Sequence, residues 1–231
     1  QGLNADGRGW REMAVLVRTN AQTRAFEEQF LKRQIPYELV GGVHFYSRAE
    51  IEDLVAYLRV LRNPRDDLSL LRILNNPPRG IGKATQQLLQ QRAAEESQSL
   101  WDALVGSDLG SFPARGAKAL GEFRDLIRGL QSDAAERPLP SLLDRLLDAT
   151  GYAKLYDADE PEGQAKLENI EEFLTAAQEF TEERLQAGET DLLTAFLDHA
   201  SLVADIDLWR ESGGVSLMTL HSAKGLEFPI V

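Results

Sequence analysis

Polar side chains of different kinds follow one apolar segment near the carboxyl end of the sequence. The segment covers residues 215–220 and carries Thr219; His221 and Glu227 come after it, with Gly225 between them. A polar turn directly after a strand is where an α/β sheet places ligand chemistry. Thr219 and His221 can donate hydrogen bonds to phosphate, while Glu227 can accept one from a ribose hydroxyl or hold a water beside a nucleotide. Gly225 would let the backbone approach such a ligand closely, so the segment is predicted to be a ligand site.

A second group of polar residues follows the apolar run at residues 13–17. Arg18 could meet a phosphate there, and Asn20 could contact the backbone or a base of a nucleic acid. The alternative interpretation is that Asn20 only caps the helix that follows, while Arg18 is solvated. The local pattern by itself favours this alternative.

A third candidate is the turn between two predicted helices, which holds in order Asn75, Asn76, Pro77, Pro78, Arg79, Gly80, Ile81, Gly82 and Lys83. The amides of Gly82, Lys83 and Ala84 would point out of a positive helix N-terminus, and the glycines let the backbone approach a ligand. Arg79 and Lys83 add full charges. The pattern resembles the helix-hairpin-helix turn, which grips the DNA backbone without reading bases. The alternative is an ordinary helix–helix corner whose glycines serve its geometry alone.

Strand and helix patterns alternate at the start of the chain. Residues 13–17 suit a central parallel strand, residues 21–34 have helical spacing and residues 37–40 read as a second strand, which together form the building block of a parallel sheet. From there the pattern is helical, with stripes near 48–62, 67–75, 83–97, 117–132, 139–149, 164–187 and 190–203. The strand pattern returns at 215–220 and needs neighbours to pair with. A helical domain inserted into an α/β domain is therefore favoured over two consecutive domains with a stray terminal strand.

The charge of the chain is unevenly distributed. The formal net charge of the 231 residues is −12, yet residues 1–90 carry 13 Lys and Arg against 10 Asp and Glu. A phosphate-binding surface is therefore expected in the first ninety residues, with the acidic remainder as solvated helix faces. The chain has no Cys, which excludes disulfides and thiolate metal sites and favours a reducing cytoplasm. We expect no membrane span, because no apolar run is long enough, and no signal peptide at residues 1–4.

The sequence lacks the parts that an NTPase needs for phosphoryl transfer. A P-loop requires a Gly-Lys pair in a defined pattern, and the single Gly-Lys pair, Gly82-Lys83, has Pro77 and Ala84 where Gly and Ser or Thr should stand. No Asp-Glu pair follows an apolar strand, and the three histidines have no metal-ligand spacing. We therefore expect no catalytic residue and no metal site in this chain, and no ATP hydrolysis by the chain alone.

Four segments, in the same order, resemble motifs of the UvrD/PcrA/Rep family of superfamily 1 DNA helicases. They are residues 14–24, residues 41–53 beginning Gly-Gly-Val-His-Phe-Tyr, residues 75–82, and residues 215–228, which resemble helicase motif five. The resemblance implies the first part of a second RecA-like domain at residues 1–50, its inserted helical domain at 51–212, and a return to the RecA-like domain at 213–231. The first RecA-like domain, with the P-loop, and the last motif would lie outside this sequence. ATP and Mg²⁺ would be cofactors of the longer protein, with neither bound to this chain alone.

The resemblance also implies roles for individual residues. Asn20 and His221 match contacts to single-stranded DNA, and Glu227 in the motif with Gly225 matches a nucleotide site. Gly80 through Thr85 matches a contact of the insertion with duplex backbone. Glu52 stands where the family often has Lys, which puts a DNA contact of that helix start in doubt.

The implied function is that of a fragment of an ATP-dependent helicase that moves 3′ to 5′ on single-stranded DNA, in DNA repair or replication in the cytoplasm. Its partners would be single-stranded and duplex DNA and other repair or replication proteins, with no membrane. One alternative is a non-enzymatic DNA-binding or regulatory module built on the helix-hairpin-helix-like turn. Another is a protein–protein adaptor that uses the acidic helices.

Overall fold

The computed structural model describes residues 8–106, 109–207 and 213–231. These residues form two compact units, which are described separately. Unit 1 comprises the described residues within Gln1–Glu52, Asp157–Phe173 and Asp198–Val231, and unit 2 comprises those within Asp53–Tyr156 and Leu174–Leu197. In the described part of the chain the secondary structure is mostly helical, with nine α-helices and one small parallel sheet.

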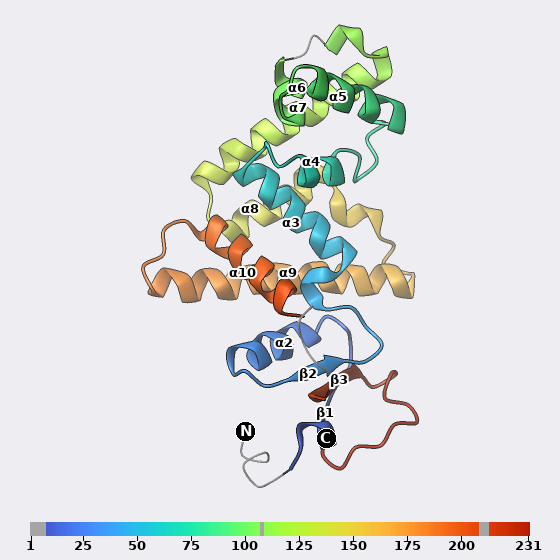
Figure 1. Cartoon of the computed structure of the whole chain (residues 1–231), viewed down its shortest axis with the longest axis vertical. Coiled ribbons are helices and arrows are strands. Elements are labelled where there is room, and N and C mark those ends of the chain that lie inside the picture. The colour runs from blue at the N-terminus through green and yellow to red at the C-terminus, as the bar shows by residue number, and fades with distance from the viewer. Residues whose placement is uncertain (1–7, 107–108, 208–212) are drawn as a thin grey trace. The chain divides into compact units, whose positions relative to one another are not determined.

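Unit 1 is built on a three-stranded parallel sheet. The strands are β1 (Ala14–Val17), β2 (Tyr37–Leu39) and β3 (Val215–Thr219), and their order in the sheet is β1-β3-β2 (Figure 1). β3 is the central strand of these three, whereas residues 13–17 were expected to be central. Beyond β1 there is an isolated parallel bridge, from Met13 to Ile230. Four of the five residues of β3 are buried, which suits a strand that has neighbours on both sides.

The strand–helix–strand pattern expected at the start of the chain is confirmed. The core of the sheet consists of Met13, Val17, Ile35, Tyr37, Val215 and Leu217. Phe30 and Leu31 of α2 (Thr23–Lys32) pack against this core. The prediction that Asn20 caps α2 is wrong: the helix begins three residues later, and its N-cap is Gln22, without a side-chain cap. The Gln22 amide oxygen instead accepts the backbone N–H groups of Arg18 (2.9 Å) and Thr19 (3.3 Å), which folds residues 18–22 into a tight turn.

Three helices supply residues to both units: α3 (Ala49–Arg62), α9 (Pro161–Gln186) and α10 (Leu192–Asp207). The first turns of α9 belong to unit 1, whereas the sequence assigned them to the inserted domain. The compact units thus divide the chain at other places than the expected boundaries after residues 50 and 212. The assignment of domains to the RecA-like fold and its insertion stays a prediction.

Unit 2 is helical in its described residues. It contains α4 (Asp67–Ile73), α5 (Lys83–Glu95), α6 (Leu100–Gly106), α7 (Ala114–Glu136) and α8 (Leu139–Thr150). Short 3-10 turns occur at η1 (Trp10–Glu12) and η2 (Phe45–Ser47) in unit 1 and at η3 (Leu109–Ser111) and η4 (Tyr152–Leu155) in unit 2. Figure 1 shows α5, α6 and α7 side by side, and α6 contacts both neighbours. The sequence analysis missed α6, because seven residues cover only two turns and give too short an apolar stripe to recognise.

The core of unit 2 follows from the apolar stripes of its helices. On α7 the side chains of Leu120, Phe123, Ile127 and Leu130 are buried on one face, at the spacing of helical turns. α8 ends at Thr150 and is capped by Gly151, whose φ of 66° is the left-handed conformation that terminates many helices. No helix among the described residues is long and apolar enough to cross a membrane.

Candidate functional site

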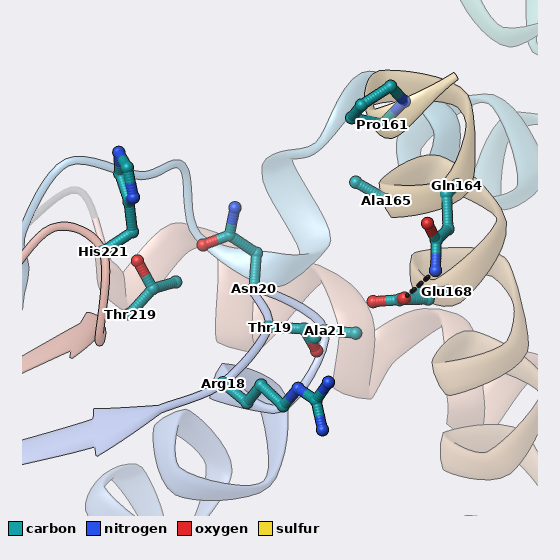
Figure 2. A pocket seen from close by; sticks show the side chains of 10 residues that line it. All are labelled: Arg18, Thr19, Asn20, Ala21, Pro161, Gln164, Ala165, Glu168, Thr219 and His221. Carbon is teal, nitrogen blue, oxygen red and sulfur yellow. Dashed lines mark hydrogen bonds between the residues drawn. The ribbon is translucent and has the colours of Figure 1, made fainter. Parts of the chain in front are cut away.

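Unit 1 contains a pocket at the carboxyl ends of β1 and β3. It has a volume of about 530 Å³, within the range of ligand-binding sites. Its wall consists of Arg18, Thr19, Asn20, Ala21, Pro161, Gln164, Ala165, Glu168, Thr219 and His221 (Figure 2). These residues come from the turn after β1, from the first turns of α9 and from the end of β3.

The parallel register explains why two separate polar segments meet here. Val17 pairs with Thr219, and the Leu220 amide donates a 2.9 Å hydrogen bond to the Val17 carbonyl. The segments that follow β1 and β3 therefore leave the sheet at the same edge and at the same level. The structure thus brings Asn20 and His221, each predicted as a site residue from its own segment, to one pocket.

Asn20 presents an exposed side chain to this pocket. Among the described residues no hydrogen bond of its amide group is found, whereas its backbone carbonyl is held by the Thr23 amide (3.1 Å) and by Arg48 (3.0 Å). The side-chain amide, with both a donor and an acceptor, is therefore free for a ligand. Figure 2 shows it between the end of β3 and the α9 wall.

The turn after β3 is held by Thr219. Its hydroxyl oxygen accepts the Ser222 amide at 3.2 Å and lies 3.0 Å from the Ser222 hydroxyl. His221 is exposed on this turn, and its side chain makes no hydrogen bond within the described ranges. The ring can therefore donate to or accept from a ligand, while Thr219 has less freedom than the sequence suggested.

Gly225 and Glu227 lie outside this pocket. Gly225 has a φ of 87°, in the left-handed region that glycine adopts without strain, while its close approach to a ligand stays a prediction. Glu227 is exposed, and no ion pair of its carboxylate is seen in the described part of the chain. The predicted nucleotide residues are therefore not among those that line the pocket of Asn20 and His221.

The α9 wall of the pocket was not found from the sequence. Gln164 and Glu168 stand one turn apart on α9, and the Gln164 amide donates to the Glu168 carboxylate at 3.2 Å. The wall made by the strand ends carries Arg18 and neutral donors, while the α9 wall carries a carboxylate. An anionic group is therefore favoured on the strand side of the pocket. The helical pattern of residues 164–187 predicted the helix but gave no signal that its first turns would face Asn20.

A buried polar cluster lies between α2 and the neighbouring elements of unit 1. Arg24 donates to Glu172 at 2.5 Å and to Glu28 at 3.0 Å, and the Tyr46 hydroxyl donates to Glu28 at 3.0 Å. Burial raises the pKa of the Glu28 carboxyl, but His199, whose Nε2 lies 3.8 Å from this carboxylate, and the charge of Arg24 outweigh it, and the pKa falls below its ordinary value. Burial and the Glu28 charge hold the pKa of Tyr46 well above its ordinary value.

The turn at residues 75–85 belongs to unit 2. The Asn75 side-chain oxygen accepts the amides of Arg79 (2.9 Å) and Ile81 (3.0 Å), and Ile81 is fully buried. Gly80 has a φ of 84°, in the left-handed region that favours glycine. Internal hydrogen bonds and one buried anchor therefore fix the shape of the turn.

Arg79 is used inside the protein. Its guanidinium donates to the carbonyl oxygens of Ile73 (3.0 Å) and Pro77 (2.9 Å) and to the Tyr57 hydroxyl. The same group lies over the rings of Tyr57 and Phe123. Burial raises the pKa of Tyr57 to about 12, so its hydroxyl stays protonated. Arg79 thus shapes the turn, and little of its donor capacity is left for a phosphate.

The exposed part of the turn is the start of α5. Gly82 is its N-cap in extended conformation, without a side-chain cap, and Gly82, Lys83 and Ala84 are all exposed. The first amides of a helix have no partner within the helix. These exposed amides are therefore available to an anion, and anion binding at this turn stays a prediction. Thr85 is buried, and a Cβ at Gly116 would stand only 2.7 Å from its hydroxyl oxygen, so Thr85 packs against α7 and does not face solvent.

Arg115 is a residue beside the turn that the sequence analysis missed. It is exposed at the start of α7, and its Nε atom would lie 3.5 Å from a Cβ at Gly80. Its charge thus stands beside Gly80, although the two residues are 35 positions apart in the sequence. Only the packing of α7 against its neighbours brings it there, which no local pattern reveals.

The described residues contain no group of three or more His, Asp or Glu side chains arranged to hold a metal ion. Glu227 alone cannot form a Mg²⁺ site, which needs several oxygen ligands in near-octahedral geometry.

Comparison with known proteins agrees with the resemblance seen in the sequence. The family model described as the UvrD-like helicase C-terminal domain matches residues 3–109 and 116–231. The chain is 42% identical over 226 residues to the "ATP-dependent DNA helicase PcrA" of Staphylococcus epidermidis, which covers 97% of this chain and 31% of that protein. It is 40% identical over 227 residues to the protein of the same name from Staphylococcus aureus, covering 98% of this chain and 31% of that protein. The chain therefore spans 31% of the length of these relatives. With nearly all of its residues matched by the family model, the chain belongs to the UvrD-like helicase C-terminal domain family.

Proposed function

We propose that the chain is part of a longer ATP-dependent DNA helicase that moves 3′ to 5′ on single-stranded DNA. The observation that carries this proposal is the convergence of Asn20, Thr219 and His221 on one pocket at the carboxyl ends of two paired strands. The similarity to proteins named as ATP-dependent DNA helicases supports it. Residues 1–50 and 213–231 would belong to a RecA-like domain, and residues 51–212 to its helical insertion.

The pocket would hold one stretch of single-stranded DNA. His221 and Arg18 would donate hydrogen bonds to phosphate, and the free Asn20 amide would contact the backbone or a base. The carboxylate of Glu168 would keep phosphates away from the α9 wall. The strand path would therefore follow the ends of β1 and β3.

The turn before α5 would grip duplex DNA by its phosphates. The amides of Gly82, Lys83 and Ala84 would supply hydrogen bonds, and the side chains of Lys83 and Arg115 would supply charge. Arg79, Ile81 and Thr85 would hold the turn in shape, as a helix-hairpin-helix element requires. Such contacts position the duplex and carry no sequence information.

Glu227 and Gly225 would form part of the nucleotide site of the longer protein. The chain supplies neither a P-loop nor a set of metal ligands in its described residues, so the remaining groups for ATP and Mg²⁺ would come from the rest of the helicase. Closure around ATP would shift the strand contacts at Asn20 and His221, which would couple hydrolysis to movement along DNA. Other repair or replication proteins as partners stay a prediction.

The experiment that tests this function measures ATP hydrolysis and unwinding by the full-length protein. We expect ATPase activity stimulated by single-stranded DNA, and unwinding of a duplex with a 3′ tail but not of one with a 5′ tail. An ATPase that ignores DNA would overturn the proposal. Unwinding from a 5′ tail would overturn the direction of movement alone.

A further inference from the structure

We propose that Arg48 is a positioning residue of the single-strand pocket, because it ties the turn that carries Asn20 to the helix that forms the opposite wall. This inference rests on the proposed function, since it concerns how the same pocket holds a DNA strand. Arg48 lies outside the pocket and acts through the residues that it binds.

The Arg48 side chain is buried, with 8% of the residue exposed, and its guanidinium joins four segments of unit 1. Its Nη2 donates to the Asn20 carbonyl at 3.0 Å and to the Thr23 hydroxyl oxygen at 2.8 Å. Its Nη1 donates to the Asn169 side-chain oxygen at 2.7 Å, and its Nε donates to the Val43 carbonyl at 3.2 Å. One planar group thus connects the turn after β1, the start of α2, the segment before η2 and α9.

Asn169 is held in the one orientation that suits this arrangement. Its amide nitrogen donates to the Glu50 carboxylate at 2.6 Å, so its oxygen faces Arg48. Asn169 and Glu50 are both buried, and an unpaired amide or carboxylate in their place would be costly. Asn169 on α9 therefore always presents its oxygen, and not its amide nitrogen, to Arg48.

The connection matters for the pocket because each end adjoins a wall residue. The Asn20 backbone carbonyl accepts hydrogen bonds from Arg48 and from the amide and hydroxyl of Thr23, and its side chain lines the pocket. Asn169 directly follows Glu168, which lines the opposite wall. Figure 2 shows the two walls facing each other across the cavity. Arg48 therefore acts together with Thr23 on the turn that carries Asn20, and it alone links this turn through Asn169 to the residue next to Glu168 in the hydrogen bonds described above.

Lysine cannot replace arginine at this position. A single ammonium group on a flexible chain cannot reach acceptors on opposite sides as a planar guanidinium does. Burial lowers the pKa of Arg48, while the carboxylates of Glu27, Glu50 and Glu172 act against this and favour the charged form. Arg48→Lys should therefore keep a cation in the unit but lose the connection between the walls.

A neighbouring ion pair provides a matched control. Arg24 on α2 donates to Glu172 on α9 at 2.5 Å, one turn beyond Asn169, so it also joins α2 to α9. Glu172 does not line the pocket. Glu172→Ala should therefore cost stability, as Asn169→Ala does, without moving Asn20.

The experiment uses the full-length protein and three variants: Arg48→Lys, Asn169→Ala and Glu172→Ala. For each, thermal unfolding gives stability, and ATPase titrated with oligothymidylate gives the DNA concentration for half-maximal stimulation and the rate at saturating DNA. We expect Arg48→Lys and Asn169→Ala to raise the half-maximal DNA concentration about fivefold to tenfold, the effect of misplacing one or two hydrogen bonds. The saturated rate should stay near that of the wild type. Glu172→Ala should leave both values unchanged at a similar loss of stability.

Two results would overturn the inference. One is an unchanged half-maximal DNA concentration in a folded Asn169→Ala protein. The other is a rise in all three variants that follows their loss of stability. If the wild type itself lacks DNA-stimulated ATPase, the proposed function fails. A stimulated wild type with an unaffected Asn169→Ala variant refutes the role of Arg48 alone.

Discussion

The backbone amide of Leu220 donates a 2.9 Å hydrogen bond to the carbonyl oxygen of Val17. It comes directly after the register pair of Val17 with Thr219, where β1 and β3 end together. The segments that follow β1 and β3 leave the sheet side by side, and polar residues of both segments line one pocket. Ligands of parallel sheets bind at the carboxyl ends of the strands, and in this chain Asn20, Thr219 and His221 line a pocket there.

Asn20→Ala should weaken binding of single-stranded DNA by about fivefold, the effect of one lost hydrogen bond. Stability should stay unchanged, because the Asn20 amide makes no hydrogen bond to another described residue. Fluorescence anisotropy with labelled oligothymidylate measures the affinity. Gln90→Ala, an exposed amide on α5, is the control and should bind as the wild type does. Equal affinity of the Asn20 and Gln90 variants would count against a strand contact at Asn20.

Gly82→Val should weaken binding to duplex DNA while the protein stays folded. A Cβ at Gly82 meets no atom of the chain within 4 Å, and the extended conformation with φ of −71° suits valine. Any effect of the side chain must therefore arise against a ligand. Gly129→Val places the same side chain in open space on α7 and serves as the control. Unchanged duplex affinity in a folded Gly82→Val protein would refute the assignment of the turn.

Arg79 and Lys83 should respond differently to substitution. Arg79→Met should lower the free energy of unfolding by about 2–4 kcal/mol, because two backbone carbonyls and the Tyr57 hydroxyl lose a charged donor. Lys83→Ala should leave stability unchanged and reduce the slope of log affinity for duplex against log salt by about one. Urea unfolding and salt titrations separate the two effects. A salt slope reduced only by Arg79→Met would reverse these roles.

The sequence was sufficient for features that depend on neighbours along the chain. The apolar runs predicted the three strands, and Pro77 with the glycines predicted the turn before α5. It was insufficient wherever a tertiary partner decides. Arg79 looked like a phosphate ligand because its partner Tyr57 lies on another helix, α3. The α9 wall was missed because no residue next to Glu168 in the sequence indicates that this helix faces Asn20.

Glu28 should make stability depend on pH in the acidic range. Burial raises the pKa of Glu28, but His199 and Arg24 lower it by more than burial raises it. The folded pKa therefore lies below the ordinary value of 4.5. A carboxyl with a lowered folded pKa stabilises the protein above its unfolded pKa, and this contribution is lost as the pH falls through the folded pKa. Glu28→Gln should therefore be less stable than the wild type at pH 7, and the difference should shrink toward pH 3. Urea unfolding over this range tests it, and a constant difference would show that the charge of Glu28 contributes nothing.

Glu227→Gln should lower ATP turnover of the full-length protein more than it lowers DNA affinity. The carboxylate is exposed and lies outside the pocket that holds Asn20 and His221, so its loss should change neither folding nor strand contacts. An amide keeps the size of the side chain but is a weaker acceptor for a ribose hydroxyl or a water beside the nucleotide. ATPase at saturating DNA and anisotropy with labelled DNA, on the same preparation, provide the comparison. Equal losses in turnover and affinity would count against a nucleotide role and would place Glu227 on the path of the DNA strand instead.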